Sequence, residues 1–222
     1  MADARDLLTL AEAKSRLRIN ASDSSRDEEL AAYITAASLL IDEWAGPVVQ
    51  FAVTGERHDG TARSGYDSAH IVVLAHRPVA AFGSIVELSG GSSTTLTQIS
   101  GQTEPTDGFF AERHPPNPTL YSGVIRRTHG TVRTGFAWGL NNIVCSYTAG
   151  RVATTTAVTA QFKQAAGLVL KNLWREEEFS TGAVDEYEVP RQSFPTFAMP
   201  NVVKELLADE LGQNDAVSGG FA

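Results

Sequence analysis

Residues 27–46, with the sequence DEELAAYITAASLLIDEWAG, decide how the first part of this chain folds. Large apolar side chains recur here every three or four residues, which is the spacing of one face of an α-helix. Ser25 and Glu28 form a capping-box pattern at the start, and Gly46-Pro47 forms a stop at the end. The stretch therefore predicts an amphipathic helix that packs its apolar face against other segments.

Two other segments have the character of helices that can pack with this one. Thr9 and Glu12 form a second capping-box pattern, which predicts a short helix over LAEAKSRLRI, residues 10–19. Residues 157–178, AVTAQFKQAAGLVLKNLWREEE, also place their apolar side chains on one helical face. We expect the core of a helical bundle to contain Leu30, Ile34, Leu40, Ile41, Trp44, Phe162, Val169 and Leu173.

The middle of the chain has a different character. It is rich in Gly, Thr, Ser, Val and Pro, and its short β-prone runs alternate with turn signals such as SGGSS and HPPNP. Runs such as FAVTGERHDG, GFFAERH and LYSGVIRRTHG read as strands or hairpin arms. The pattern predicts a small antiparallel barrel or sandwich.

The predicted fold is therefore α+β, an α-helical bundle with an inserted small antiparallel β domain. We expect an N-terminal helical hairpin in residues 1–49 and the inserted β domain in residues 50–150. Residues 151–178 supply the core helix that completes the bundle. Residues 179–222 form an extended C-terminal arm with a short helix and a disordered end.

Composition excludes several classes of protein. The chain has 222 residues with a formal net charge of −8, which argues against a protein that coats nucleic acid with its whole surface. The single cysteine, Cys145, leaves no partner for an intramolecular disulfide and no Cys-based zinc site. The N-terminus lacks the apolar run of a signal peptide, and no stretch approaches the about 18 apolar residues of a membrane span. We expect a soluble chain.

A search for catalytic motifs yields little. The sequence contains no Gly-rich phosphate loop, no His-Glu-x-x-His motif and no Gly-x-Ser-x-Gly motif. Cys145 lies between apolar residues, which favours a buried thiol over a nucleophile. We expect no catalytic residue, no cofactor and no metal. The alternative is a hydrolase with a metal site at Glu56, His58 and Asp59.

The distribution of charge is more informative than any motif. No Asp or Glu occurs between Glu112 and Glu176, whereas that span contains several arginines and lysines. The charges either neutralise one another within the folded chain or join subunits head to tail in a ring. DNA binding ranks third, because these arginines lack an obvious recognition helix or stacking platform. The candidates for inter-subunit charge are Arg126, Arg127, Arg133, Glu176, Glu177 and Glu178.

The region near the C-terminus combines apolar side chains with prolines. Pro190, Pro195 and Pro200 exclude a regular helix or a central strand between them. The apolar residues either fold back on the chain's own core or insert into a partner. The candidates for a partner-binding arm are Phe194, Phe197, Met199, Val202, Val203 and Leu206.

Three stretches together resemble the head-to-tail connector proteins of tailed phages, also called adaptors. LTLAEAKSRLRI followed by a polar turn and DEELAAYITAASLLIDEWAG is similar to their opening. The Tyr-x-x-Gly of VCSYTAG, followed by AVTAQFKQAAGLVLKNLWREE, is similar to their second signature, and MPNVVKELLADEL resembles the end of longer members. The chain departs from the family in its longer β insert and in RVATTTAVTA, which lacks a Val-Pro before the second helix.

The resemblance implies a non-enzymatic structural virion protein of the bacteriophage neck, assembled in the host cytoplasm. It implies a homo-oligomeric ring, usually of twelve copies, that binds the portal protein on one side and a stopper or tail-terminator protein on the other. Double-stranded DNA would pass through the channel during viral genome ejection without sequence-specific binding, and no membrane is involved. The alternatives are another neck ring, a stopper or tail terminator, and the hydrolase named above.

Overall fold

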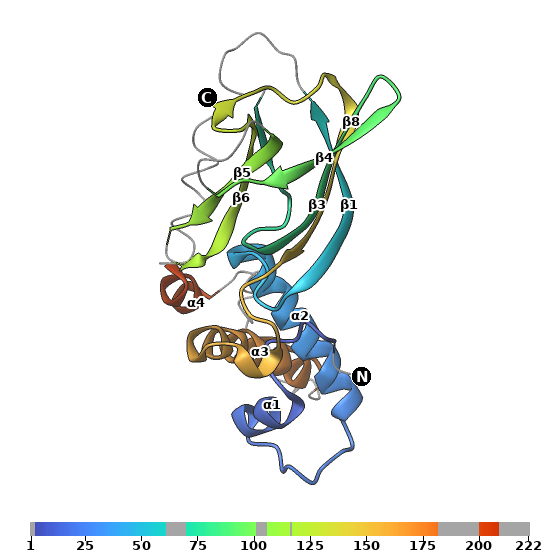
Figure 1. The fold of residues 1–222 in the computed structure, drawn as a ribbon. Helices are drawn as coiled ribbons and strands as arrows, with labels where there is room; N and C mark the ends of the chain where they lie inside the picture. The colour runs from blue at the N-terminus through green and yellow to red at the C-terminus, as the bar shows by residue number, and fades with distance from the viewer. Residues whose placement is uncertain (1–2, 61–69, 101–105, 116, 182–199, 209–222) are drawn as a thin grey trace. The chain divides into compact units, whose positions relative to one another are not determined.

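The chain forms two compact units, which we describe separately. In the computed structural model the described residues are 3–60, 70–100, 106–115, 117–181 and 200–208, and for residues 176–181 only the backbone is described. The helical unit comprises residues 1–49 and 154–222, and the barrel unit comprises residues 50–153. Figure 1 shows the elements of both units. No helix in the described ranges is long and apolar enough to cross a membrane.

The helical unit is built around the two longest helices. Its elements are α1 (Leu10–Leu17), α2 (Asp27–Ala45), the 3-10 turn Thr155–Ala157, α3 (Ala160–Thr181) and α4 (Asn201–Leu206). α2 packs against α3, and α1 contacts both of them. The buried side chains at this packing include Leu30, Ile34, Ile41, Phe162 and Val169.

Three residues expected in the helical core lie outside it or at its margin. Trp44 is 40% exposed, because the buried stripe of α2 runs through Ile41 and Ala45 and leaves Trp44 beside it. The ring of Trp44 is instead covered by the Lys204 ammonium, 5.0 Å from its centroid. Leu40 and Leu173 are only half-buried, and the α3 stripe continues through Leu170 and Trp174.

The two predicted capping boxes have different outcomes. In α1 the prediction is confirmed: the Glu12 amide donates to Thr9 Oγ1 at 3.2 Å, and the Thr9 amide donates to Glu12 Oε2 at 2.8 Å. In α2 it is wrong, because the N-cap is Arg26 without a side-chain cap. The Ser25 hydroxyl donates to Asp23 Oδ1 at 2.6 Å within the preceding turn, so it does not cap the helix.

Local sequence sets the end of α2 and the start of α3. α2 ends at Gly46, whose φ of 74° is readily adopted only by glycine. α3 begins at Ala160, later than the predicted start at residue 157, because residues 155–157 form a separate 3-10 turn. The short C-terminal helix is also confirmed, as α4, although its described part is shorter than predicted.

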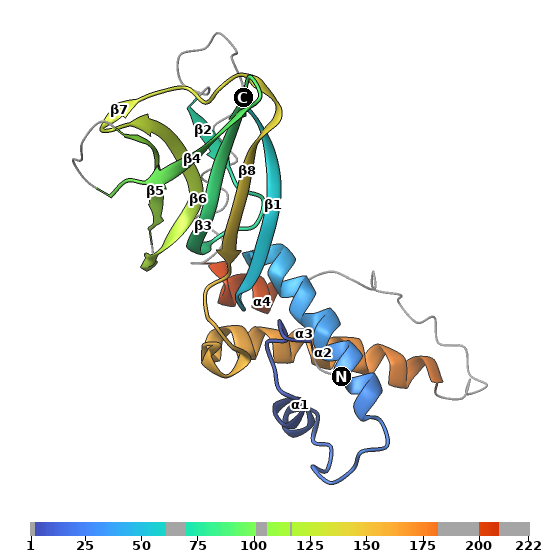
Figure 2. The ribbon, with the colours of Figure 1, turned by 45° about the vertical axis from the view of Figure 1, so that its right-hand side comes forward.

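The described residues of the barrel unit form one eight-stranded sheet, shown in two views 45° apart in Figures 1 and 2. Its strands are β1 (Phe51–Gly60), β2 (Ile71–Val73), β3 (Val79–Ser89), β4 (Ser92–Gln98), β5 (Asp107–His114), β6 (Asn117–His129), β7 (Val132–Arg133) and β8 (Gly139–Ala149). The order is β1-β8-β3-β4-β5-β6-β2, with β7 paired to β6. β3 also pairs with β6 at Val79 and Tyr121, which closes β3, β4, β5 and β6 into a small barrel.

One strand pair departs from the predicted antiparallel arrangement. β4 and β5 pair in parallel, with Thr97 opposite Gly108. A Cβ on Gly108 would lie 2.5 Å from the Thr97 carbonyl oxygen, so this close approach requires glycine. The barrel core is apolar, and its fully buried members include Val79, Ile85, Ile125, Ile143 and Cys145.

Candidate functional site

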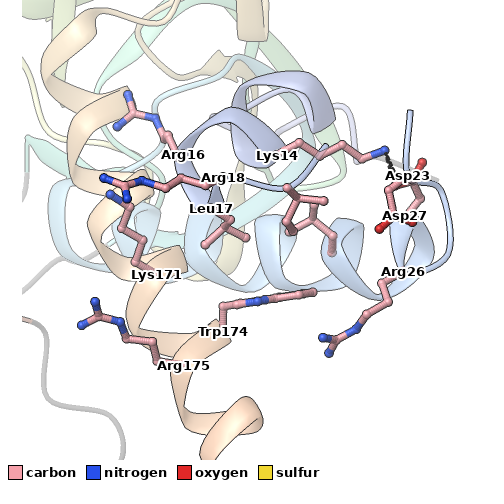
Figure 3. Close-up of a pocket in the computed structure, with 12 residues that line it drawn as sticks. Lys14, Arg16, Leu17, Arg18, Asp23, Arg26, Asp27, Lys171, Trp174 and Arg175 are labelled. Carbon is pink, nitrogen blue, oxygen red and sulfur yellow. Dashed lines mark hydrogen bonds and ion pairs between the residues drawn. The ribbon is translucent and has the colours of Figure 1, made fainter. Parts of the chain in front are cut away.

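A hollow of about 530 Å³ opens in the helical unit (Figure 3). It lies between the end of α1, the loop that follows, the start of α2 and the second half of α3. Its charged lining residues are Lys14, Arg16, Arg18, Asp23, Arg26, Asp27, Lys171 and Arg175. Its apolar lining residues are Leu17, Ile19, Leu30 and Trp174. Cations therefore outnumber carboxylates in a concave site with an apolar part.

Some of these charges are matched within the unit. Lys14 Nζ lies 2.5 Å from Asp27 Oδ1 and donates to the Asp23 carbonyl oxygen at 2.6 Å. The Arg26 guanidinium forms a bidentate contact with the Glu29 carboxylate. Nε donates to Oε2 at 2.6 Å, and Nη2 donates to Oε1 at 3.0 Å. These contacts neutralise the side of the hollow formed by the loop and the start of α2.

The other side of the hollow carries four cations, Arg16, Arg18, Lys171 and Arg175, which we call the basic cluster. Figure 3 shows these side chains together, on the opposite side from Lys14. Within the part of the chain that the structure describes, no salt bridge joins any of the four to a carboxylate. The basic cluster is therefore a local excess of positive charge on a chain of net charge −8.

Arg16 is held in place by α3. Its Nη1 donates to Gln164 Oε1 at 2.8 Å. Its side chain also lies across Gly167, where a Cβ would come within 2.6 Å of both Arg16 Cδ and Arg16 Nη1. The absence of a side chain at Gly167 thus creates the space that the guanidinium occupies.

Arg18 takes a backbone conformation that usually favours glycine. It is the C-cap of α1 with a φ of 61°, and its amide donates to the carbonyl oxygens of Lys14 and Ser15. Glycine is common in the left-handed conformation at helix ends because other residues are less stable there. The chain places a long cationic side chain at this position and directs it to the hollow.

The apolar part of the hollow centres on Trp174. This residue is 5% exposed, and Tyr33 meets its ring edge to face with a centroid distance of 5.7 Å. The Arg26 guanidinium carbon lies 4.2 Å from the ring centroid, in a cation–π arrangement. Tyr33 and Arg26 thus cover much of the Trp174 ring. The half-buried side chains of Leu17 and Ile19 supply apolar surface next to the basic cluster.

The barrel unit contains the other candidate site, at Glu56 and His58. His58 Nε2 lies 2.6 Å from Glu56 Oε1, which also accepts the Ala75 amide at 2.9 Å, and the Tyr147 hydroxyl donates to Glu56 Oε2. Burial raises the pKa of Glu56, but the hydrogen bonds from Tyr147, Ala75 and His58 outweigh it and lower the pKa below its ordinary value. Burial, reinforced by the Glu56 charge, raises the pKa of Tyr147.

This arrangement does not assemble the predicted hydrolase site. Asp59 accepts the Asn141 amide at 2.6 Å and is absent from the contacts of Glu56 and His58, since adjacent strand residues point to opposite faces. No group of three metal-ligating side chains occurs among the residues that the structure describes. Cys145 is fully buried, and burial raises the pKa of its thiol to about 12, so it lies in the core as an un-ionised thiol.

The arginines predicted for inter-subunit contact have partners within the barrel unit. Arg127 is 5% exposed and contacts Glu87 at 3.2 Å and Asp107 at 2.7 Å, so its charge is matched within the barrel unit. Arg126 forms an ion pair with Glu112. Arg133 is exposed, and the side chains of residues 176–178 lie outside the described part.

The predicted arm is described only at its end. Phe194, Phe197 and Met199 lie outside the described residues. Val202 is 62% exposed, whereas Val203 is fully buried in the helical unit and is therefore not part of an exposed binding surface.

The basic cluster is not apparent from the sequence alone. Its residues come from RLR at residues 16–18 and from KNLWR at residues 171–175, two short basic segments far apart in the sequence. Each segment taken alone resembles an ordinary solvated part of a helix. The two segments form one site because α1 contacts α3 in the folded chain. A single sequence does not reveal that contact.

The comparisons with known proteins concern the fold. No known family model matches the chain, and no curated protein sequence matches it. It is similar to a chain in the neck of an empty gene transfer agent (GTA) particle computed with C6 symmetry, with a TM-score of 0.51 and 16% identity over 92% of this chain and 89% of that chain. The chain thus shares the mixed α+β fold of that neck chain.

Two other solved structures were matched at lower similarity. A chain of the virion of a native GTA particle has a TM-score of 0.46 and 18% identity, over 83% of this chain and 84% of that chain. A chain in the neck of a native GTA particle computed with C12 symmetry has a TM-score of 0.46 and 14% identity, over 95% of this chain and 94% of that chain.

Proposed function

We propose that this chain is a structural, non-enzymatic component of the neck of a phage-like particle. The observation that carries the proposal is the shared fold with a GTA neck chain, which extends over 92% of this chain and 89% of that chain. A match of this extent includes most of both the helical unit and the barrel unit. Neck proteins act by assembly, and the chain's exposed apolar side chains, among them Val132, Trp138 and Leu140, are typical of contact surfaces.

Within the neck, we assign the chain to the adaptor ring that docks on the portal protein. The support is the resemblance of residues 8–46, 143–178 and 198–211 to phage head-to-tail connector proteins. In this role about twelve copies form a closed head-to-tail ring. The ring surrounds the channel through which double-stranded DNA leaves the particle, and its other side contacts a stopper or tail-terminator protein.

Native mass spectrometry of the chain, alone and mixed with the portal protein of its own genome, tests this function. We expect either a ring or a monomer that becomes a stoichiometric ring on the portal. A ring that ignores the portal and binds the tail-tube protein instead would assign the chain to the stopper or tail-terminator position. A monomer that binds neither protein would contradict the neck function.

The partner-binding arm is tested in the same assay. Replacing Phe194 and Phe197 with Ser should leave the circular dichroism spectrum and the ring intact but abolish docking on the portal. Leu39→Ser is the matched control, because Leu39 is 46% exposed on α2 and lies outside the proposed arm. Unchanged docking of the double variant would exclude the arm as the anchor.

A further inference from the structure

The basic cluster needs a counter-charge that the described part of the helical unit does not supply. Lys171 and Arg175 are four residues apart on α3, so their like charges lie on one face of the helix and repel each other. Arg16 and Arg18 add two more cations from the end of α1. An anionic ligand would relieve this repulsion and form hydrogen bonds with the guanidinium groups.

The site is built to receive such a ligand. Arg16 is fixed by Gln164 and by the space over Gly167, so little side-chain freedom is lost when a ligand binds. The C-cap position of Arg18 fixes its backbone, and its exposed side chain can turn toward a ligand in the hollow. Pre-organised guanidinium groups recognise carboxylates through paired hydrogen bonds.

The anionic ligand could be DNA or an acidic peptide segment, and the apolar part of the hollow distinguishes between them. DNA presents a regular row of phosphates, which would leave the apolar surface of Leu17 and Ile19 unused. The net charge of −8 also opposes binding of DNA by the chain as a whole. A peptide segment that alternates carboxylates with apolar side chains matches both parts of the hollow.

We propose that the hollow binds residues 184–189 of a second copy of this chain. Their sequence, VDEYEV, carries Asp185, Glu186 and Glu188 interleaved with Val184, Tyr187 and Val189. The carboxylates pair with the basic cluster, and the apolar side chains lie against Leu17 and Ile19 in the lining of the hollow. This inference rests on the proposed ring, in which each copy gives its segment to the next and the contacts close head to tail.

A charge-reversal exchange tests whether the contact joins two copies. One variant reverses the hollow, with Arg18→Glu and Lys171→Glu, and the other reverses the segment, with Asp185→Lys and Glu186→Lys. We expect each variant alone to fold but to lose the ring in native mass spectrometry. Mixed in equal amounts, the two should restore an alternating ring, because each segment then meets a hollow of opposite charge.

The alternatives give different outcomes. If the segment occupied the hollow of its own chain, mixing would restore nothing, whereas combining all four substitutions in one chain would restore the ring. If both variants formed rings as well as the parent chain, the hollow would have no part in assembly. Either result would overturn the proposal. Arg57→Glu with Arg113→Glu is the control for net charge, because both residues are exposed in the barrel unit.

A binding assay separates this inference from the proposed function. The probe is a labelled peptide of residues 182–190, GAVDEYEVP, and the receptor is the segment-reversed chain, whose hollow is intact. Binding that weakens at least about tenfold in the hollow-reversed chain and at high salt supports the site even where no ring forms. No binding, or displacement of the peptide by a short DNA duplex, would overturn the proposed ligand while leaving the neck function to the portal assay.

Discussion

Arg127 Nη2 on β6 lies 3.2 Å from Glu87 Oε2 on β3, and both side chains are buried in the barrel unit. Arg127 also donates to Asp107 and to the Thr128 carbonyl oxygen, and Glu87 accepts the Ala137 amide. This network ties three strands and the segment before β8 together. Arg127 and Glu87 have little access to water, whereas the Asp107 side chain is half-exposed. A buried charge of this kind is stable only while its partners are present.

Arg127→Ala should therefore destabilise the barrel unit by about 3–5 kcal/mol, because it leaves the Glu87 carboxylate buried without its counter-charge. Arg126→Ala is the matched control. The Arg126 side chain is 27% exposed and its partner Glu112 is 35% exposed, so its loss should cost less than about 1 kcal/mol. Urea denaturation measures both, and equal losses would contradict the assignment of Arg127 to a buried network.

Gly167→Ala should weaken self-association of the chain without lowering its free energy of unfolding. Alanine is more favourable than glycine inside a helix by about 0.5–1 kcal/mol, and the atoms that its Cβ would meet belong to the flexible end of Arg16. The new Cβ pushes the Arg16 guanidinium out of the hollow and breaks its hydrogen bond with Gln164. We therefore expect an unchanged or slightly raised free energy of unfolding together with weaker self-association. A variant that is more stable and assembles normally would show that the position of Arg16 is unimportant.

The lowered pKa of Glu56 predicts how the barrel responds to acid. Its ordinary value is 4.5, and the folded state favours the charged carboxylate. Its contribution to stability is therefore complete above the ordinary value and is lost as the pH falls through the lower folded value. Between about pH 5 and pH 3 the parent chain should lose stability more steeply than Glu56→Gln. Parallel pH profiles of the unfolding free energy would contradict this role of Glu56.

Alanine substitutions along α2 should lower the free energy of unfolding by amounts that follow the burial of each side chain. Ile41 is fully buried, so Ile41→Ala should cost about 2–5 kcal/mol. Leu39→Ala, two residues away and 46% exposed, should cost much less. Thermal unfolding followed by circular dichroism checks the pair, and a larger effect at Leu39 would mean that α2 buries a different face.

The parts of the fold that were predictable are those set by local pattern. α2 runs over the stretch first identified from its apolar spacing, and the strand over FAVTGERHDG spans Phe51–Gly60 as predicted. The capping box of α1 was also predictable, because its hydrogen bonds join Thr9 and Glu12, which are three residues apart in the sequence. At α2 the same motif failed because Asp23 competes for the Ser25 hydroxyl.

The features that were not predictable depend on contacts between distant segments. The parallel pairing of β4 with β5 and the closure of β3 on β6 are choices of strand order, which alternation of apolar residues does not encode. The pairing of Arg127 with Glu87 joins β6 to β3, so a count of charges along the chain could not reveal it. The hollow was missed for the same reason, since its cations come from α1 and α3.

The two ends of the barrel unit are bound to each other. The Gln50 amide donates to the Val152 carbonyl oxygen at 2.8 Å, and Phe51 on β1 lies opposite Ala149 on β8. The long excursion of the chain through the barrel thus begins and ends at adjacent points, so to the rest of the chain it is equivalent to a short hairpin loop. A segment whose two ends are adjacent can be exchanged for a longer or shorter one without moving the residues that flank it. Insertions, deletions or replacement of strands within the barrel would therefore leave the distance between its two ends unchanged, and the flanking helical segments could keep their sequences.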